Sequence, residues 1–144
     1  MKSLKTTITI DAPARQVWQV LMDFQSYTEW NPFILAIKGE AKVGHQLTNT
    51  LQLEGQKPQV FKPTVLRVEA GKSFHWLGHL FIKGLFDGHH YFELETLGPN
   101  QTRLVHGEKF TGLLSGLILK MIGKATRDGF EKMNQALKAR VEAA

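Results

Sequence analysis

Short stretches of alternating hydrophobic and polar residues fill most of this chain before a long helical pattern begins. Ile8 and Ile10 alternate with threonines, which is the period of a half-buried strand. Apolar residues at helical spacing over 17–22 predict a short helix directly afterwards. Asp11 and Pro13 precede that helix and are typical of a helix start, where Asp11 would accept hydrogen bonds from free N–H groups.

A series of strands is expected after Pro32, which disfavours helical geometry at the residue before it. Alternation and turn residues predict strands over 33–37, 45–54, 60–69, 73–80, 89–97 and 102–110. Within 60–69 the apolar residues fall on both parities, which a bulge would reconcile. Residues 83–88 are expected to form a loop with two glycines.

The pattern from about 113 to 141 is helical and long enough, at about 1.5 Å per residue, to cross a whole domain. Gly116, Gly123 and Gly129 interrupt it, and each costs about 1 kcal/mol relative to alanine. Something must therefore pass close to the helix backbone. Tight packing against the sheet and room for a ligand are both open explanations.

Composition narrows the class of protein. A chain of 144 residues makes one domain, 1–144, and its lack of cysteine excludes disulfides, thiolate nucleophiles and cysteine-ligated metals. The net charge of +5 comes from scattered lysines and arginines, so no nucleic-acid partner is expected. Neither a signal peptide nor a membrane-spanning segment is recognisable, which predicts a cytoplasmic protein without integral membrane association.

The last two predicted strands carry the candidate chemistry. Period two places His90 on one face with Phe92, and His106 and Glu108 on one face with Phe110. The short turn between the strands makes them neighbours in a hairpin. All three polar side chains are therefore expected on the inner, apolar face, where an unpartnered polar group costs about 1–3 kcal/mol.

Three roles for His90, His106 and Glu108 are open. They are a mutually satisfied core cluster, polar anchors for a ligand, or a general acid/base couple with His106 and Glu108 as catalytic residues. Two histidines and a carboxylate also form a known metal-ligand set, but their spacing matches no recognised motif, so no metal is expected. No cofactor is expected either.

Two motif pairs in the chain resemble one known superfamily. The first is I-D-A-P-x-x-x-V-W-x-V-L-x-D followed by Y-x-x-W-N-P-F, and the second is G-L-F-D-G-x-H-x-F-x-L followed by T-R-x-x-H-G-E-x-F-x-G-L-L. These resemble the START-like (SRPBCC) superfamily, polyketide cyclase/dehydrase-like branch. The resemblance implies an α+β helix-grip fold, with a curved antiparallel sheet of about seven strands around a long C-terminal helix. It also implies two short helices after strand one and an apolar cavity between sheet and helix.

The function expected first is binding of a small hydrophobic ligand, aromatic, polyketide-like or lipid, in that cavity. The polar anchors would be His90, His106 and Glu108, and the walls would be Trp30, Phe33, Trp76, Phe92, Phe110 and Met121. One alternative is a cyclase or dehydratase that uses His106 and Glu108 as acid and base. Another is a lipid-transfer or membrane-facing module that touches vesicles through Phe81, Phe86 and Lys83. A weak homodimer is compatible with any of these.

Overall fold

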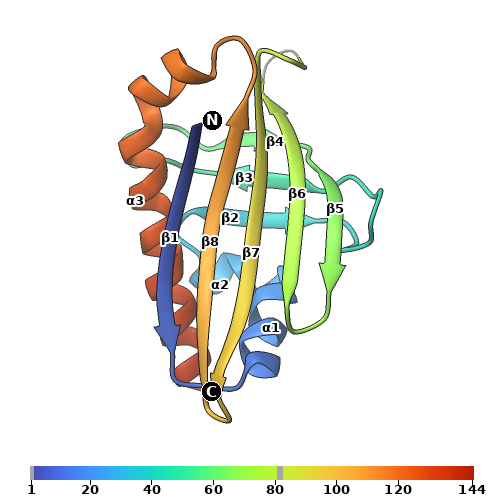
Figure 1. The fold of residues 1–144 in the computed structure, drawn as a ribbon, viewed down its shortest axis with the longest axis vertical. Helices are drawn as coiled ribbons and strands as arrows, with labels where there is room; N and C mark the ends of the chain where they lie inside the picture. The colour runs from blue at the N-terminus through green and yellow to red at the C-terminus, as the bar shows by residue number, and fades with distance from the viewer. Residues whose placement is uncertain (1, 81–82) are drawn as a thin grey trace.

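A curved antiparallel sheet wraps around one long C-terminal helix (Figure 1). The computed structural model describes residues 2–80 and 83–144. Its strands are β1 (Lys2–Ile10), β2 (Ile34–Lys38), β3 (Thr48–Leu51), β4 (Gln59–Phe61), β5 (Thr64–Glu69), β6 (Ser73–Leu80), β7 (Phe86–Gly98) and β8 (Gln101–Thr111). Its helices are α1 (Ala14–Met22), the 3-10 turn η1 (Phe24–Ser26), α2 (Tyr27–Trp30) and α3 (Ser115–Glu142).

Hydrogen bonding divides the strands into two sets. Five strands pair in the order β1-β8-β7-β6-β5 and three in the order β2-β3-β4, all antiparallel. A single bridge between Gln46 and Thr64 links the two sets. In Figure 1 the three-stranded set runs across behind the five long strands. The predicted helix-grip architecture is confirmed, with eight strands in the described part of the chain where about seven were expected.

The extra strand arises at Pro63, where the single strand expected over 60–69 breaks in two. β4 pairs with β3, whereas β5 pairs with β6 in the other set. Proline has no N–H to donate to a ladder, and the Pro63 carbonyl accepts a 2.8 Å bond from Leu47 instead. The expected bulge lies in β5, where the pairing with β6 shifts between Val65 and Arg67.

Two further boundaries differ from the sequence prediction. β7 begins at Phe86, so the second half of the expected glycine loop is already strand, with Gly88 paired between Gly78 and Phe110. Asp11 does not cap α1, which starts after Pro13 without a side-chain cap. The Asp11 backbone N–H instead donates to Glu142 at 2.8 Å, which ties the start of the chain to its last helix.

Helix α3 is buried along its second half. Its inward face there consists of Phe130, Met133, Leu137 and Val141, each at most 2% exposed. Its first half is different, because Leu117 is 59% and Met121 75% exposed. The fully buried apolar contacts of α3 therefore lie beyond about residue 126, while Ile122 and Ala125 are partly buried against the core.

The glycines of α3 do not share one explanation. A methyl group on Gly129 would overlap the Phe33 ring, so tight packing requires glycine there. A methyl group on Gly123 would meet no other atom within 4 Å. Gly123 therefore weakens the helix without making room for a neighbour.

These two glycines provide a matched test of the packing. Gly129→Ala should lower the free energy of unfolding by about 1–3 kcal/mol, because Phe33 must move to admit the methyl group. Gly123→Ala should raise it by about 1 kcal/mol through helix propensity alone. Urea denaturation of both variants measures the difference. Equal stability of the two variants would contradict the close contact between Phe33 and α3.

Candidate functional site

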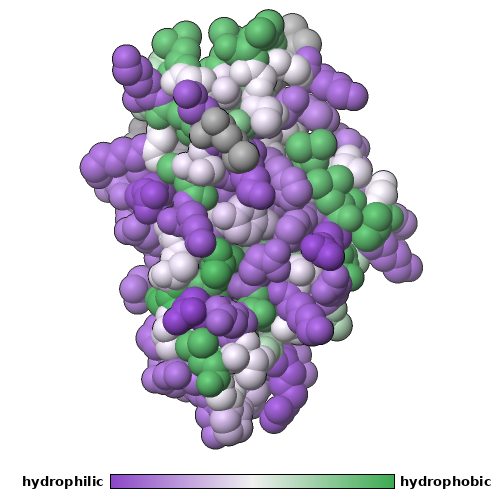
Figure 2. Space-filling model, viewed as in Figure 1, coloured by the Kyte–Doolittle hydropathy of each residue, from purple (hydrophilic) through white to green (hydrophobic). Residues whose placement is uncertain are grey.

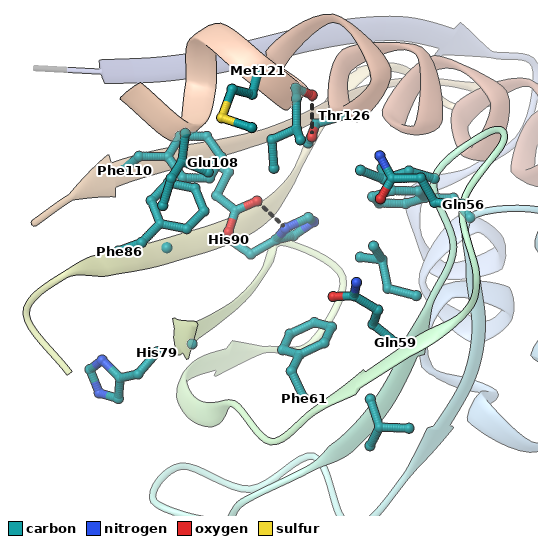
Figure 3. Close-up of a pocket in the computed structure, with 18 of the residues that line it drawn as sticks. Gln56, Gln59, Phe61, His79, Phe86, His90, Glu108, Phe110, Met121 and Thr126 are labelled. Carbon is teal, nitrogen blue, oxygen red and sulfur yellow. Dashed lines mark hydrogen bonds and ion pairs between the residues drawn. The ribbon is translucent and has the colours of Figure 1, made fainter. Parts of the chain in front are cut away.

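A cavity of about 570 Å³ lies between the first half of α3, the β3–β4 segment and strands β6 to β8 (Figure 3). Its walls are mainly apolar. Phe86 from β7 and Phe110 from β8 stack with ring centroids 5.2 Å apart and planes within 2°. Ile118 and Ile122 close it on the α3 side, and Phe61 of β4 lies across from them.

One end of the cavity is polar, and local strand geometry explains why. Glu108 and His90 are register partners on β8 and β7, so their side chains leave the sheet side by side. The Glu108 carboxyl group lies over Gly88, where any side chain would collide with it. In Figure 3 Glu108 and His90 point toward each other beside the phenylalanine pair, joined by a contact of 3.2 Å between Oε1 and Nδ1.

His90 continues this contact into the core. It is 2% exposed, and its Nε2 lies 2.8 Å from Nε2 of His106. Its ring stacks on the Trp76 indole at 4.6 Å and 15°. Both nitrogens of His90 are therefore engaged by other side chains.

His106 lies one step further from the cavity. Its ring is fully buried and stacks on Phe130 at 4.3 Å and 15°. Its Nδ1 is 2.9 Å from Oδ1 of Asn134 on α3. The Asn134 amide nitrogen donates to the Thr6 hydroxyl on β1, and that hydroxyl donates to the backbone carbonyl of His106, both at 2.8 Å. We call Glu108, His90, His106, Asn134 and Thr6 the buried hydrogen-bond chain.

Burial controls the protonation of this chain. Loss of solvent raises the pKa of Glu108 to about 8, although the neighbouring His89 opposes the shift. Loss of solvent lowers the pKa of His90 to about 3, and holds that of His106 well below the ordinary histidine value. Both shifts favour the uncharged forms, so burial favours a hydrogen bond over an ion pair between Glu108 and His90.

The predicted site residues divide into two groups. His90, Glu108, Phe33, Phe110 and Met121 line the cavity. The others lie behind it or away from it: His106, Trp76, Phe92 and Trp30.

The residues that do not line the cavity support those that do. Trp76 and Phe92 pack against the two histidine rings. Trp30 packs edge-on against Tyr27, with ring centroids 5.0 Å apart. Of the open alternatives, the structure has Glu108 in contact with His90, which stands between Glu108 and His106.

Sequence reasoning missed several parts of the site. The β3–β4 segment contributes Phe61, which the alternation pattern assigned only to a strand, and Gln59, which lies between two expected strands. Asn134 and Thr6 are 128 residues apart and carry no joint signal. A polar Asn134 between Phe130 and Leu137 on the apolar stripe of α3 is nevertheless a signal that could have been read as a buried hydrogen-bonding residue.

The described ranges contain neither a cluster of metal ligands nor a helix suited to cross a membrane. Residues 2–80 and 83–144 contain no group of three histidine, aspartate or glutamate side chains placed to hold a metal ion. The two inner histidines face each other through Nε2, so these nitrogens are already occupied. No helix in the part of the chain described is both long and apolar enough to cross a membrane.

The shifted pKa values predict how stability depends on pH. Between about pH 4.5 and 8 the folded chain keeps a proton on Glu108 that the unfolded chain has released, so stability falls as pH rises. The neutral histidines act in the opposite sense, because only the unfolded chain protonates them as pH falls below about 6.5. Above pH 6.5 the contribution of Glu108 to the pH dependence of the free energy of unfolding is the larger one.

From pH 6.5 to pH 8 the free energy of unfolding should therefore fall by about 1–2 kcal/mol. Glu108→Gln should remove this fall, because an amide cannot ionise. Chemical denaturation of both proteins across this range measures the difference. A wild-type profile as flat as that of the variant would show that Glu108 is not held neutral by burial.

Comparisons with known proteins agree with this fold. The family model described as "Polyketide cyclase / dehydrase and lipid transport" matches residues 1–142. A search of curated proteins found none that matches by sequence.

Solved structures give the same architecture. The Zhui aromatase/cyclase from Streptomyces sp. R1128 is 16% identical with a TM-score of 0.79, over 98% of this chain and 93% of that one. A START superfamily protein from Mycobacterium smegmatis is 23% identical with a TM-score of 0.74, over 98% and 97%. At these identities the likeness concerns the fold, whereas the family match spans nearly the whole sequence. The chain therefore belongs to the polyketide cyclase / dehydrase and lipid transport family, in agreement with the polyketide cyclase/dehydrase-like branch that its motifs resemble.

Proposed function

We propose that this protein binds a small, mostly apolar ligand in the cavity between α3 and the curved sheet. The observation that carries the proposal is the cavity itself, about 570 Å³ of space with apolar walls and one polar end. Ligand sites in proteins commonly have this volume and this distribution of groups. The family description, which includes lipid transport, supports the proposal.

The walls favour a ligand with a flat region. The parallel rings of Phe86 and Phe110 present aromatic surface beside Glu108. Phe61 provides a further ring on the opposite wall. A planar or aromatic ligand would bury its faces against these rings, while its polar group reached Glu108.

An enzymatic role is the second candidate, and one observation favours it. Glu108 faces the cavity with its pKa raised to about 8, which suits a group that exchanges protons near neutral pH. The aromatase/cyclase among the structural neighbours supports this candidate. The catalytic group would be Glu108 alone, since His106 does not reach the cavity. Conversion of a polyketide-like substrate that Glu108→Gln abolishes in a folded protein would favour the enzyme over the binder.

The lipid-module alternative loses one of its three expected contact residues, whereas Lys83 is exposed. Phe86 is 1% exposed and stacks on Phe110, so it cannot insert into a vesicle. Phe81 lies outside the described residues. Figure 2 shows apolar side chains at the end of the molecule where α3 begins, and Leu113 and Leu117 are exposed there. A lipid remains a candidate as the bound ligand.

A plug in the cavity tests the binding proposal. N-phenyl-1-naphthylamine is an uncharged aromatic probe whose fluorescence rises in apolar surroundings. Ile122→Trp should reduce its binding at least tenfold, because the indole would fill the space beside Phe110. Lys120→Trp adds the same side chain at an exposed position of the same helix and should bind like wild type. Equal binding by both variants would exclude the cavity as the site.

Native mass spectrometry of gently purified protein gives a second readout. A stoichiometric adduct, lost in Ile122→Trp and kept in Lys120→Trp, would also identify the ligand class. Absence of any adduct together with absence of probe binding would contradict the proposed function.

A further inference from the structure

We propose that the ligand must donate a hydrogen bond to Glu108, as a hydroxyl or N–H group does, and that Thr6 and Asn134 are positioning residues that set this preference from outside the cavity. The inference rests on the proposed binding function and specifies its ligand class. It follows from the direction in which each bond of the buried hydrogen-bond chain must run.

The direction is fixed at the end far from the cavity. A backbone carbonyl can only accept, so the Thr6 hydroxyl must donate its single proton to the His106 carbonyl. The Thr6 oxygen is then an acceptor for Asn134, whose Nδ2 faces it at 2.8 Å. This fixes the orientation of the Asn134 amide, because the flipped amide would place two acceptors in contact.

The fixed amide determines the tautomer of His106. Oδ1 of Asn134 can only accept, so Nδ1 of His106 carries the proton that bridges the 2.9 Å between them. The ring is fully buried between Phe92 and Phe130, where an uncharged imidazole is favoured. An uncharged ring with its proton on Nδ1 has a bare Nε2, which must accept.

The same reasoning passes through His90 to Glu108. Nε2 of His90 lies 2.8 Å from the bare nitrogen of His106 and must donate to it. The His90 ring is 2% exposed between Trp76 and Phe130, where the uncharged imidazole is favoured, so its Nδ1 is bare. Oε1 of Glu108 at 3.2 Å must then supply a proton. Glu108 is therefore a neutral carboxylic acid whose proton points at His90 and away from the cavity.

This leaves an acceptor at the polar end of the cavity. Oε2 of Glu108, which lies over Gly88, is the carbonyl oxygen of the acid and makes no hydrogen bond to the described part of the chain. His90 has both nitrogens engaged, and Thr126 donates its hydroxyl to the Ile122 carbonyl. A ligand hydroxyl or N–H would satisfy Oε2, whereas a ligand carboxylate would bring acceptor against acceptor.

Charged groups around the cavity do not change this preference. The α3 residues that line it are uncharged: Ile118, Met121, Ile122 and Thr126. His79 at the rim is paired with Asp87 at 2.7 Å, and His89 lies on the opposite face of β7. The cations on the lining are Lys57 and Lys62, exposed on and beside the β3–β4 segment. An anionic ligand would turn its charge toward these lysines and leave Glu108 unpartnered.

Three naphthalene derivatives of nearly equal size test the preference by calorimetric titration at pH 6.5. 2-Naphthol should bind about three- to tenfold more tightly than 2-methoxynaphthalene, which has the same ring and oxygen but no donor. 2-Naphthoate should bind more weakly than either. Equal affinity for naphthol and its methyl ether would overturn the donor requirement while leaving the binding function intact. Failure of all three to bind would overturn the proposed function, and the ligand class with it.

Variants distinguish the residue proposed to contact the ligand from a residue proposed to position it. Glu108→Met should equalise the affinities for naphthol and its methyl ether, because the acceptor is gone. Thr6→Val should also reduce their ratio toward one, because Asn134 is then free to flip and reverse the chain. Thr7→Val makes the same change at the exposed neighbouring position and should keep the wild-type ratio. A wild-type ratio in Thr6→Val would overturn the positioning role.

Nitrogen-15 spectra of the histidine side chains test the chain without a ligand. Wild type should show the proton on Nδ1 of His106 and on Nε2 of His90, and Thr6→Val should weaken or reverse this pattern while Thr7→Val keeps it. The opposite tautomers in wild type would overturn the inference, whatever the calorimetry shows. The expected tautomers without any ligand binding would confine the failure to the proposed function.

Discussion

Two buried histidines and a partly buried glutamate meet where β7 and β8 face α3, and loss of solvent makes each of them depend on a partner. Glu108 contacts His90, His90 contacts His106, and His106 contacts Asn134. An unpartnered polar group at any of these positions would cost about 1–3 kcal/mol. The arrangement is therefore satisfied only when strands from the end of the sheet, the last helix and the first strand are all in place.

This dependence joins the polar end of the cavity to distant parts of the sequence. The Thr6 hydroxyl and the His106 carbonyl are 100 residues apart, and Asn134 reaches Thr6 over 128 residues. Local changes near the cavity thus have consequences on the far side of the sheet. In the same way, the β1–α3 contact is connected through hydrogen bonds to Glu108 at the polar end of the cavity.

Stacking on aromatic rings stabilises the two histidines in the core. Each imidazole lies flat against a larger ring, Trp76 for His90 and Phe130 for His106. An uncharged imidazole packs much as a small aromatic ring does, with its two nitrogens pointing along the plane. Trp76 and Phe92, which were expected to contact a ligand, instead pack against the histidines of the buried hydrogen-bond chain. Phe33, Phe86 and Phe110 line the cavity.

The sequence by itself determined the strand parity that turns His90, His106 and Glu108 inward, because alternation is a local property. The helix-grip fold was implied by the resemblance of the chain's motifs to a known superfamily. The sequence did not determine the break at Pro63, because residues 60–69 could have paired with either of the two sets of strands. Only the tertiary structure decided which histidine meets the cavity and which partner fixes its proton. Those choices depend on Thr6 and Asn134, whose proximity is a consequence of packing α3 against β1 and of no pattern along the chain.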